Sequence, residues 1–337
     1  MNDIRRIVIV GNGFDMAHDL KTSYMEFVNK CKSEPISAIQ EYDELMNTMG
    51  IYEDGTVDRE PQTWYAFEKN FESIVRNLYM DFHFNGNETN IIEYANSVFS
   101  KVEKQLFEYL KDEYFNNEES VKVNLKSSIQ KYVNDDTLFI SFNYTDTVKL
   151  YTNNYYYVHG CMTDDECIIL GFADGTTSCL QSGEYLRYSK AVKKEYLEFV
   201  RFVHSKSLEI SEEITNEIMH HIDTLFSSRG EYNLPLLEDG SYDTKGMSVI
   251  VREFAEYNNF HGSAEPYDFK YVEEIVIAGH GLESDLPYLR TLGESNSIKR
   301  INLFKYSEEN EEEIRRKKKT LVELWGISEE CIFVEEY

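Results

Sequence analysis

An apolar run of four residues, Ile7–Val10, leads directly into Gly11–Gly13 near the start of the chain. Short continuous runs of β-branched residues are typical of strands that lie inside a parallel sheet and are covered on both faces. A Lys-Thr-Ser segment follows, in which Thr22 or Ser23 is suited to cap a helix whose apolar positions begin at Tyr24. Strand, glycine turn and helix in this order indicate an α/β fold with a parallel sheet.

The same strand pattern recurs later in the chain, separated by helical patterns. Further strands are predicted at Leu138–Phe142, Tyr155–Val158, Cys167–Leu170, Glu274–Ala278, Ile301–Tyr306 and Cys331–Val334. The segments of about 36–133 and about 181–270 are predicted to be large helical insertions. We therefore predict one domain over residues 1–337 with a Rossmann-like α/β fold, built on a doubly wound and mainly parallel sheet.

The composition is strongly acidic, with a formal net charge of -27. A surface of this average sign repels DNA, so a nucleic-acid partner is not expected. The one obvious basic run, residues 315–319, directly follows the acidic residues 308–313. We interpret the two runs as one solvated helix with ion pairs along it and a favourable dipole interaction at each end.

Targeting and membrane signals are not visible in the sequence, because the apolar run after Arg6 is only four residues long. The five cysteines are odd in number and form no C-x-x-C pair, which is typical of reduced thiols rather than of disulfides or a zinc site. We therefore expect a cytoplasmic protein that has no membrane partner and binds no metal.

The glycine turn after the first strand has two interpretations. Gly11 and Gly13 lack a Cβ, so the turn can approach a phosphate closely and aim its amides at the anion. The turn can equally be a plain connection, because Met16 stands where a full G-x-G-x-x-G motif has its third glycine. Asp15 is placed to reach a ribose hydroxyl or to cap the local backbone, and the sequence leaves both roles open.

Polar residues also follow the later strands. Asn143 comes where α/β proteins bind ligands, and its amide could hold a ribose hydroxyl or an attacking water, or merely close an Asx-turn. His159, beside Gly160, could accept a proton at neutral pH or only bond to the backbone. The same ambiguity holds for His280, which lies between two glycines, and Asp146 could equally begin a helix.

In this order, the blocks resemble the AbiH family of bacteriophage abortive-infection proteins. The most distinctive block is Phe142-Asn143-Tyr144-Thr145-Asp146-Thr147. The resemblance implies a protein of phage defence that responds to an unidentified phage trigger or partner protein. The matching residues span most of the chain: Ile7–Asp15, Leu20–Tyr24, Trp64–Glu68, Ser141–Thr147, Val158–Gly160, Leu170–Gly171 and Ile275–Asp285.

More distantly, a glycine turn, an asparagine after a strand and a His-Gly pair in this order are similar to the sirtuin superfamily. That similarity implies a sirtuin-like domain that binds NAD, with Asn143 holding the ribose or water and His159 acting as the base. The expected NAD-binding residues are Gly11, Asn12, Gly13, Phe14, Asp15, Asp146, Gly160, Gly279, His280 and Asp285.

Two departures from the sirtuin pattern bear on the expected chemistry. Sirtuin-like defence enzymes usually carry an aspartate directly after Asn-Tyr, whereas Thr145 stands there in this chain and the acid is Asp146. Either Asp146 serves from one position later, or the role of the acid is lost. The deacylases of the superfamily also carry a four-cysteine zinc module, and no such module is present, so deacylation is not the expected chemistry.

The sequence therefore predicts a defence enzyme that hydrolyses NAD to nicotinamide and ADP-ribose and so depletes NAD in the infected cell. One alternative is a module that binds a nucleotide as a signal without turnover. Another is a metal-dependent nuclease, although no compact acidic triad stands out. The helical insertions are candidate places for a lid or for an interface between copies of the chain.

Overall fold

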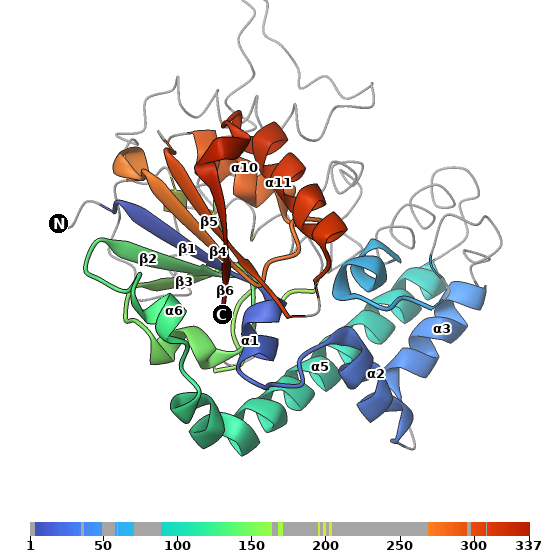
Figure 1. Cartoon of the computed structure of the whole chain (residues 1–337). Coiled ribbons are helices and arrows are strands. Elements are labelled where there is room, and N and C mark those ends of the chain that lie inside the picture. The colour runs from blue at the N-terminus through green and yellow to red at the C-terminus, as the bar shows by residue number, and fades with distance from the viewer. Residues whose placement is uncertain are drawn as a thin grey trace, which may run out of the picture.

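Among the residues that the structure describes, six parallel strands form one sheet in the order β3-β2-β1-β4-β5-β6 (Figure 1). The computed structural model describes residues 4–34, 37–48, 58, 60–70, 89–163, 168–170, 195, 198–199, 202–203, 269–294, 298–307 and 309–337. The strands are β1 (Arg6–Val10), β2 (Thr137–Ser141), β3 (Tyr155–Tyr157), β4 (Glu274–Ala278), β5 (Arg300–Lys305) and β6 (Ile332–Glu336).

The central strands form where the sequence is apolar without interruption, because both faces of the sheet are covered. Every residue of β2 is buried, and in β1 and β4 only the first residue is partly exposed. The register places Ile9 of β1 between Ile140 of β2 and Ile277 of β4. Side chains alternate along a strand, so these three face one side of the sheet while Val8 faces the other.

Helices pack on both faces of the sheet (Figure 1). The face of Ile9 belongs to one core with Leu289 and Leu321, and the face of Val8 belongs to a second core with Ile129. This arrangement confirms the predicted Rossmann-like α/β class. The helices are α1 (Asn12–Ala17), α2 (Tyr24–Lys32), α3 (Ala38–Thr48), α5 (Thr89–Val123), α6 (Ser127–Gln130), α10 (Leu286–Glu294) and α11 (Glu311–Trp325), with short 3-10 turns η2 (Asp146–Leu150), η4 (Phe269–Tyr271) and η5 (Glu329–Cys331).

Six of the predicted strands are confirmed, with ends shifted by a residue or two. The prediction of a strand at 167–170 is wrong for the residues that can be described: Cys167 lies outside them, and residues 168–170 form no strand. Ile169 instead donates its backbone N–H to the carbonyl of His159 at 3.0 Å. The segment therefore lies beside the end of β3 without becoming part of the sheet.

The described parts of the first predicted insertion, residues 36–133, are helical: α3, a helix at 64–70, α5 and α6. Figure 1 shows α2, α3 and α5 grouped to one side of the sheet. Of the second predicted insertion, 181–270, the structure describes Glu195, Glu198, Phe199, Phe202, Val203 and residues 269–270, which are helical, and the remainder lies outside the described residues. The division into one domain with two insertions stays a prediction.

The acidic and basic runs near the carboxyl end form α11, as predicted. Asn310 caps the helix, since its side chain accepts hydrogen bonds from the backbone N–H groups of Glu312 and Glu313. In return, the backbone N–H of Asn310 donates to the carboxylate of Glu313. Two parts of the prediction are wrong. Lys317 is buried and paired with Glu309 rather than solvated, and the last turn of α11 contains no basic residue. The basic residues lie mid-helix, where Arg316 pairs with Glu283 and Lys318 with Glu329 outside the helix, while Lys319 pairs with Glu323 within it.

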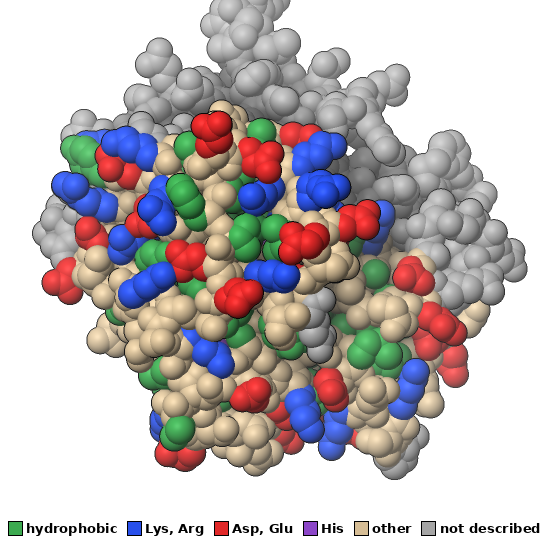
Figure 2. Space-filling view, in the orientation of Figure 1, with side chains coloured by type: hydrophobic (Ala, Val, Ile, Leu, Met, Phe, Trp, Pro, Cys, Tyr) green, Lys and Arg blue, Asp and Glu red, His purple; other side chains and the backbone are tan. Residues whose placement is uncertain are grey.

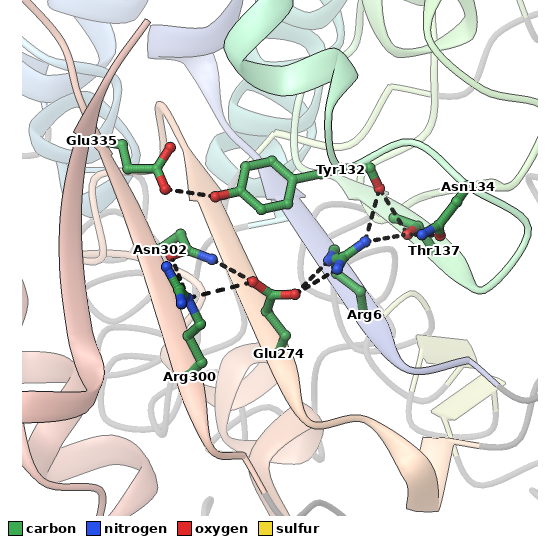
Figure 3. Close-up of polar contacts among 8 residues, drawn as sticks. All are labelled: Arg6, Tyr132, Asn134, Thr137, Glu274, Arg300, Asn302 and Glu335. Atoms are coloured by element: carbon green, nitrogen blue, oxygen red, sulfur yellow. Dashed lines mark hydrogen bonds and ion pairs between the residues drawn. The ribbon is translucent and has the colours of Figure 1, made fainter.

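Polar side chains join four strands at the amino-terminal edge of the sheet (Figure 3). Arg6 of β1 forms a salt bridge with Glu274 of β4 at 2.6 Å and also contacts the hydroxyl of Thr137 of β2 at 3.3 Å. Glu274 in turn accepts a bond from Asn302 of β5 at 2.6 Å. These contacts fix neighbouring strands in register at the edge opposite to the glycine turn.

The face shown in Figure 2 carries Lys and Arg side chains interspersed with Asp and Glu. Ion pairs such as Arg316–Glu283 and Lys319–Glu323 account for part of this pattern on α11. Within the described ranges, no helix has both the length and the apolar character that a membrane crossing needs.

Candidate functional site

A cavity of about 530 Å³ opens at the carboxyl-terminal edge of the sheet. Its walls come from the turns that follow four strands: Gly11–Gly13 after β1, Phe142–Thr145 after β2, His159 after β3 and Gly279–Gly281 after β4. The opposite wall includes residues 62–65 and 22–24 of the helical group. The cavity therefore lies between the ends of the strands and the helices beside them.

The strand order places this cavity at a topological switch point. From β1 the chain continues to β2 on one side, while β4 pairs with β1 on the other side. In open α/β sheets, ligands bind in the crevice outside the carboxyl ends of strands at such a point, and the order 3-2-1-4-5-6 is that of dinucleotide-binding folds. The location alone favours a nucleotide-sized ligand.

The glycines of the first turn serve a close approach between two pieces of backbone. A Cβ on Gly11 would lie 2.6 Å from the Cα of His280, and a Cβ on Gly13 would lie 2.9 Å from the Cα of Gly279. Gly13 also donates its N–H to the carbonyl of Gly279 at 2.9 Å, and Phe14 donates to Gly11. The close approach predicted for a phosphate is thus made by the turn after β4, and these two amides already have partners.

Asp15 is a nearly fully buried carboxylate in the wall of the cavity, 1% exposed. Its Oδ2 accepts a hydrogen bond from the hydroxyl of Thr145 at 2.6 Å. No described residue bonds its Oδ1. Burial raises the pKa of Asp15 to about 6, although the hydrogen bond from Thr145 and the nearby polar groups of Thr147 and Asn143 work against the rise. Asp15 is therefore bonded to a side chain across the site rather than capping its own helix.

Asn143 joins the turns after β1 and β2. Its side-chain NH₂ donates to the carbonyl of Gly11 at 3.0 Å, while its backbone N–H bonds to the hydroxyl of Ser141 at 3.2 Å. The Asx-turn alternative is therefore not what the structure contains, since Ser141 closes the turn. Asn143 is buried, lines the cavity and lies close enough to Asp15 to lower the pKa of that carboxyl.

His159 is held between two carboxylates. Its Nδ1 lies 2.7 Å from Oε1 of Glu195, and its Nε2 lies 3.1 Å from Oδ1 of Asp285. Burial by itself would lower the pKa of His159, but the two carboxylates raise that pKa well above 6.5. Because an ionised carboxylate only accepts hydrogen bonds, each contact favours a proton on the ring nitrogen that faces the carboxylate. The role of His159 as a base stays a prediction.

Asp285 lies behind the cavity wall and holds both histidines of the site. Its Oδ2 is 3.4 Å from Nε2 of His280 and accepts the hydroxyl of Ser284 at 2.8 Å. Although burial alone raises it, the pKa of Asp285 is lowered overall by His159 and by hydrogen bonds from His159 and His280. Glu195 also accepts a bond from Tyr288 at 2.6 Å, and burial raises the pKa of Glu195.

The structure brings most of the predicted residues together at this cavity. Gly11, Asn12, Gly13, Asp15, Asn143, His159, Gly279 and His280 line it. Phe14, Gly160, Asp146 and Asp285 are not part of the lining. Phe14 packs in the core against His18. The carboxylate of Asp146 instead forms an ion pair with Lys149 at 2.9 Å and accepts the hydroxyl of Tyr157 at 3.1 Å.

Several residues of the site were not predicted from the sequence. Thr145 lies in the cavity where Asp146 was expected, and its position directly after Asn-Tyr was a usable signal. Trp64 belongs to a block that carries the family resemblance but was not predicted as a site residue, and it donates its ring N–H to the carbonyl of Thr22 at 2.9 Å. Lys317 lies inside a charged run that indicated a solvated face. For Glu195 no local signal exists, because its contact with His159 spans 36 residues.

Carboxylates outnumber cationic groups around the cavity. Glu68, Glu283, Glu309 and Glu313 line it together with Asp15, against Lys317 and the imidazolium of His159. Lys317 is already paired with Glu309. Such a lining favours a ligand, or a transition state, that carries positive charge beside these acids. Among the described residues, no three His, Cys, Asp or Glu side chains are grouped so that they could hold a metal ion.

Comparison with known proteins links this site to one family. Neither the curated proteins nor the solved structures contain a significant match to the chain. The family model described as bacteriophage abortive infection AbiH matches residues 7–306, a stretch that contains β1 from its second residue, all of β2 to β5, and all the residues of the cavity wall up to Tyr306. The chain therefore belongs to the AbiH family, and its role lies in abortive infection by bacteriophage.

Proposed function

We propose that this protein binds NAD in the cavity at the carboxyl edge of the sheet and hydrolyses it to nicotinamide and ADP-ribose. During phage infection this reaction would deplete NAD and arrest both host and virus. The observation that carries the proposal is the buried carboxylate of Asp15 beside Asn143 at the switch point of the sheet, with Oδ1 unbonded by any described residue. NAD is here the substrate.

The charge of the cavity suits this substrate at its reacting end. The nicotinamide ring of NAD is cationic, and the bond to ribose breaks through an oxocarbenium-like state. Carboxylates near that bond, such as Asp15, stabilise positive charge as it moves onto the ribose. Nicotinamide leaves as a neutral molecule, so the site needs no strong acid to protonate it.

Placement of ribose and water is the second requirement of the reaction. Asn143 has an amide at the cavity wall whose position is fixed by its bond to Gly11. A fixed amide can orient a ribose hydroxyl or an attacking water and so lower the entropic part of the barrier. The strand order supports the same assignment, because dinucleotides bind across this point in folds of this order.

Binding without turnover is the second candidate function. Two observations favour it: both ring nitrogens of His159 are bonded to carboxylates, and the amides of Gly13 and Phe14 already bond to backbone carbonyls. A protein of this kind would sense a nucleotide and act by switching or assembling. It would bind NAD or ADP-ribose and release no product.

The test is nicotinamide release from NAD by the purified full-length protein, together with calorimetry of NAD binding. Turnover by the wild type and its loss in Asn143→Ala would support hydrolysis in this cavity. Tight binding without nicotinamide release would identify the nucleotide sensor instead. If the wild type shows no NAD binding and no turnover, both candidate functions are overturned. Turnover that Asn143→Ala leaves unchanged would place the reaction elsewhere.

A further inference from the structure

His159 and Asp15, two ionisable side chains of the cavity wall, have different surroundings. Both nitrogens of His159 are bonded to carboxylates. Asp15 has one oxygen bonded and the other without a bond from any described residue. We infer that Asp15 is the proton acceptor of the reaction proposed above, and that His159 is a fixed cation of the site. The inference rests on the proposed hydrolysis of NAD.

The bond between Thr145 and Asp15 sets the orientation of the carboxyl group. The hydroxyl of Thr145 donates a hydrogen bond to Oδ2 of Asp15 at 2.6 Å. The same hydroxyl lies 3.3 Å from the hydroxyl of Thr147. Asp15 belongs to α1, directly after the glycine turn, and Thr145 follows β2. The carboxyl is thus held from two elements, and Oδ1 is a buried oxygen that no described residue bonds. Asn143 lies next to it, so the residue that positions a water and the residue that takes its proton are neighbours.

The proposed step balances without any further reactant. The bond between C1′ of the ribose and the ring nitrogen of nicotinamide breaks, and its electron pair neutralises the positive ring. A water oxygen donates an electron pair to C1′, and one of its protons passes to Oδ1 of Asp15. The protonated carboxyl then releases this proton to solvent, so the products are nicotinamide, ADP-ribose and one proton.

The surroundings of Asp15 suit a base near neutral pH. A general base works best when its pKa lies close to the working pH, and burial brings that of Asp15 to about 6. The titratable groups that interact with it electrostatically are Tyr114 of α5 and Tyr337 at the chain end, both phenols whose pKa is raised by burial. Both are therefore neutral at pH 7. Turnover is expected to fall as the pH drops below about 6, where Asp15 becomes protonated.

The decisive variant is Asp15→Asn, which keeps the shape of the side chain and the acceptor for Thr145 but removes the base. We expect nicotinamide release to fall by roughly 10²–10⁴-fold, while the Kd for NAD measured by calorimetry stays within a few-fold. Asp19→Asn is the matched control, since it removes the same charge from an exposed turn at the other end of α1, where Asn tolerates the positive φ of 65°. This control is expected to keep wild-type turnover.

The pH profile of Thr145→Val gives an independent readout if Asp15→Asn fails to fold. Loss of the hydroxyl removes a bond that lowers the pKa of Asp15, so the acid limb of the profile should move to higher pH. An unmoved acid limb, or turnover that survives Asp15→Asn, overturns the inference while leaving hydrolysis intact. Loss of NAD binding in Asp15→Asn as large as the loss of turnover would make Asp15 a ribose ligand instead. No nicotinamide from the wild type overturns the inference together with the proposed function.

Discussion

Thr145 and Asp15, 130 residues apart in the sequence, are joined by a hydrogen bond of 2.6 Å between the turn after β2 and the first helix. The bond lies inside a site where burial has already raised the pKa of Asp15 to about 6. At pH 7 the carboxyl is therefore ionised in surroundings that disfavour its charge. A buried charge maintained at such a cost is a common feature of functional sites.

Replacing Asp15 by Asn is expected to stabilise the protein. The pKa of Asp15 is about 6 in the folded protein against 3.8 as the reference value, so the folded state holds the proton more tightly between these values. The free energy of unfolding therefore falls as the pH rises from about 4 to about 6, and stays level above. The variant should gain up to about 3 kcal/mol at pH 8 and nothing near pH 4. Urea unfolding at several pH values measures the gain, and a gain independent of pH would contradict this account of Asp15.

The contact between His159 and Asp285 predicts a second loss of stability with rising pH, in a higher pH range than the one set by Asp15. The pKa of His159 is raised above 6.5, so its contribution to stability is full below about pH 6.5 and is lost as the pH rises through the higher folded value. Asp285→Asn removes one buried partner and should lower the free energy of unfolding by about 3–5 kcal/mol at pH 6, with a smaller alkaline loss than the wild type shows.

The control for this ion pair is Glu323→Gln on α11, which removes an exposed pair with Lys319. Exposed pairs of this spacing contribute only about 0.3–0.5 kcal/mol. Chemical denaturation at pH 6 and at pH 9 compares the two variants. Equal effects of Asp285→Asn and Glu323→Gln would mean that the cluster around His159 is solvated.

Gly279→Ala is expected to be severely destabilising. Gly279 has a φ of 72°, and a Cβ there would lie 2.0 Å from the backbone nitrogen of Phe14. Gly326→Ala is the matched control, because Gly326 has a φ of 64° but open space around its Cβ position. The control should cost about 1–2 kcal/mol for the left-handed backbone alone. Thermal unfolding of both variants separates the cost of the left-handed backbone from the cost of the steric clash with Phe14. Similar losses of stability in the two variants would show that the turns after β1 and β4 can move apart.

Asn310→Ala is expected to lower the free energy of unfolding by about 1 kcal/mol. The side chain of Asn310 accepts two backbone N–H groups at the start of α11, at 2.9 Å and 3.0 Å. Asn310→Gly should cost only a few tenths of a kcal/mol, since glycine also suits this position. Equal stability of the Ala variant and the wild type in urea would mean that water replaces the cap fully.

Most of the sheet could be predicted because its strands carry a local signature. Runs such as Ile7–Val10 and Glu274–Ala278 are apolar, short and followed by glycine, and each became a strand. The segment 167–170 resembled them in composition, yet its described residues lie beside β3 outside the ladder. An apolar run of this length does not show whether a partner strand is free to receive it. The prediction that Lys317 is solvated was wrong for a similar reason, since a charged run does not reveal a partner such as Glu309 that pairs with a buried lysine.

The candidate site divides in the same way. The positions of Asn143 and His159 directly after strands follow from local pattern, and the ends of parallel strands meet at one edge, so their meeting at the cavity was predictable. Their chemical states were not. The partners of His159, Glu195 and Asp285, come from segments 36 and 126 residues away in the chain. The acid expected at Asp146 is paired with Lys149, and Thr145 contacts Asp15 instead.

The sequence by itself determined that this chain forms a parallel α/β sheet with polar groups at its carboxyl edge. The periodicity of apolar residues and the need for glycine at tight turns act over a few neighbouring residues. Only the tertiary structure decided which partners surround each of those groups and in which direction its pKa moves. Burial and electrostatic interaction depend on what is packed within a few ångströms, whatever the separation along the chain. That is why two carboxylates from distant segments raise the pKa of His159, the predicted base, and why Oδ1 of Asp15 has no bond from any described residue.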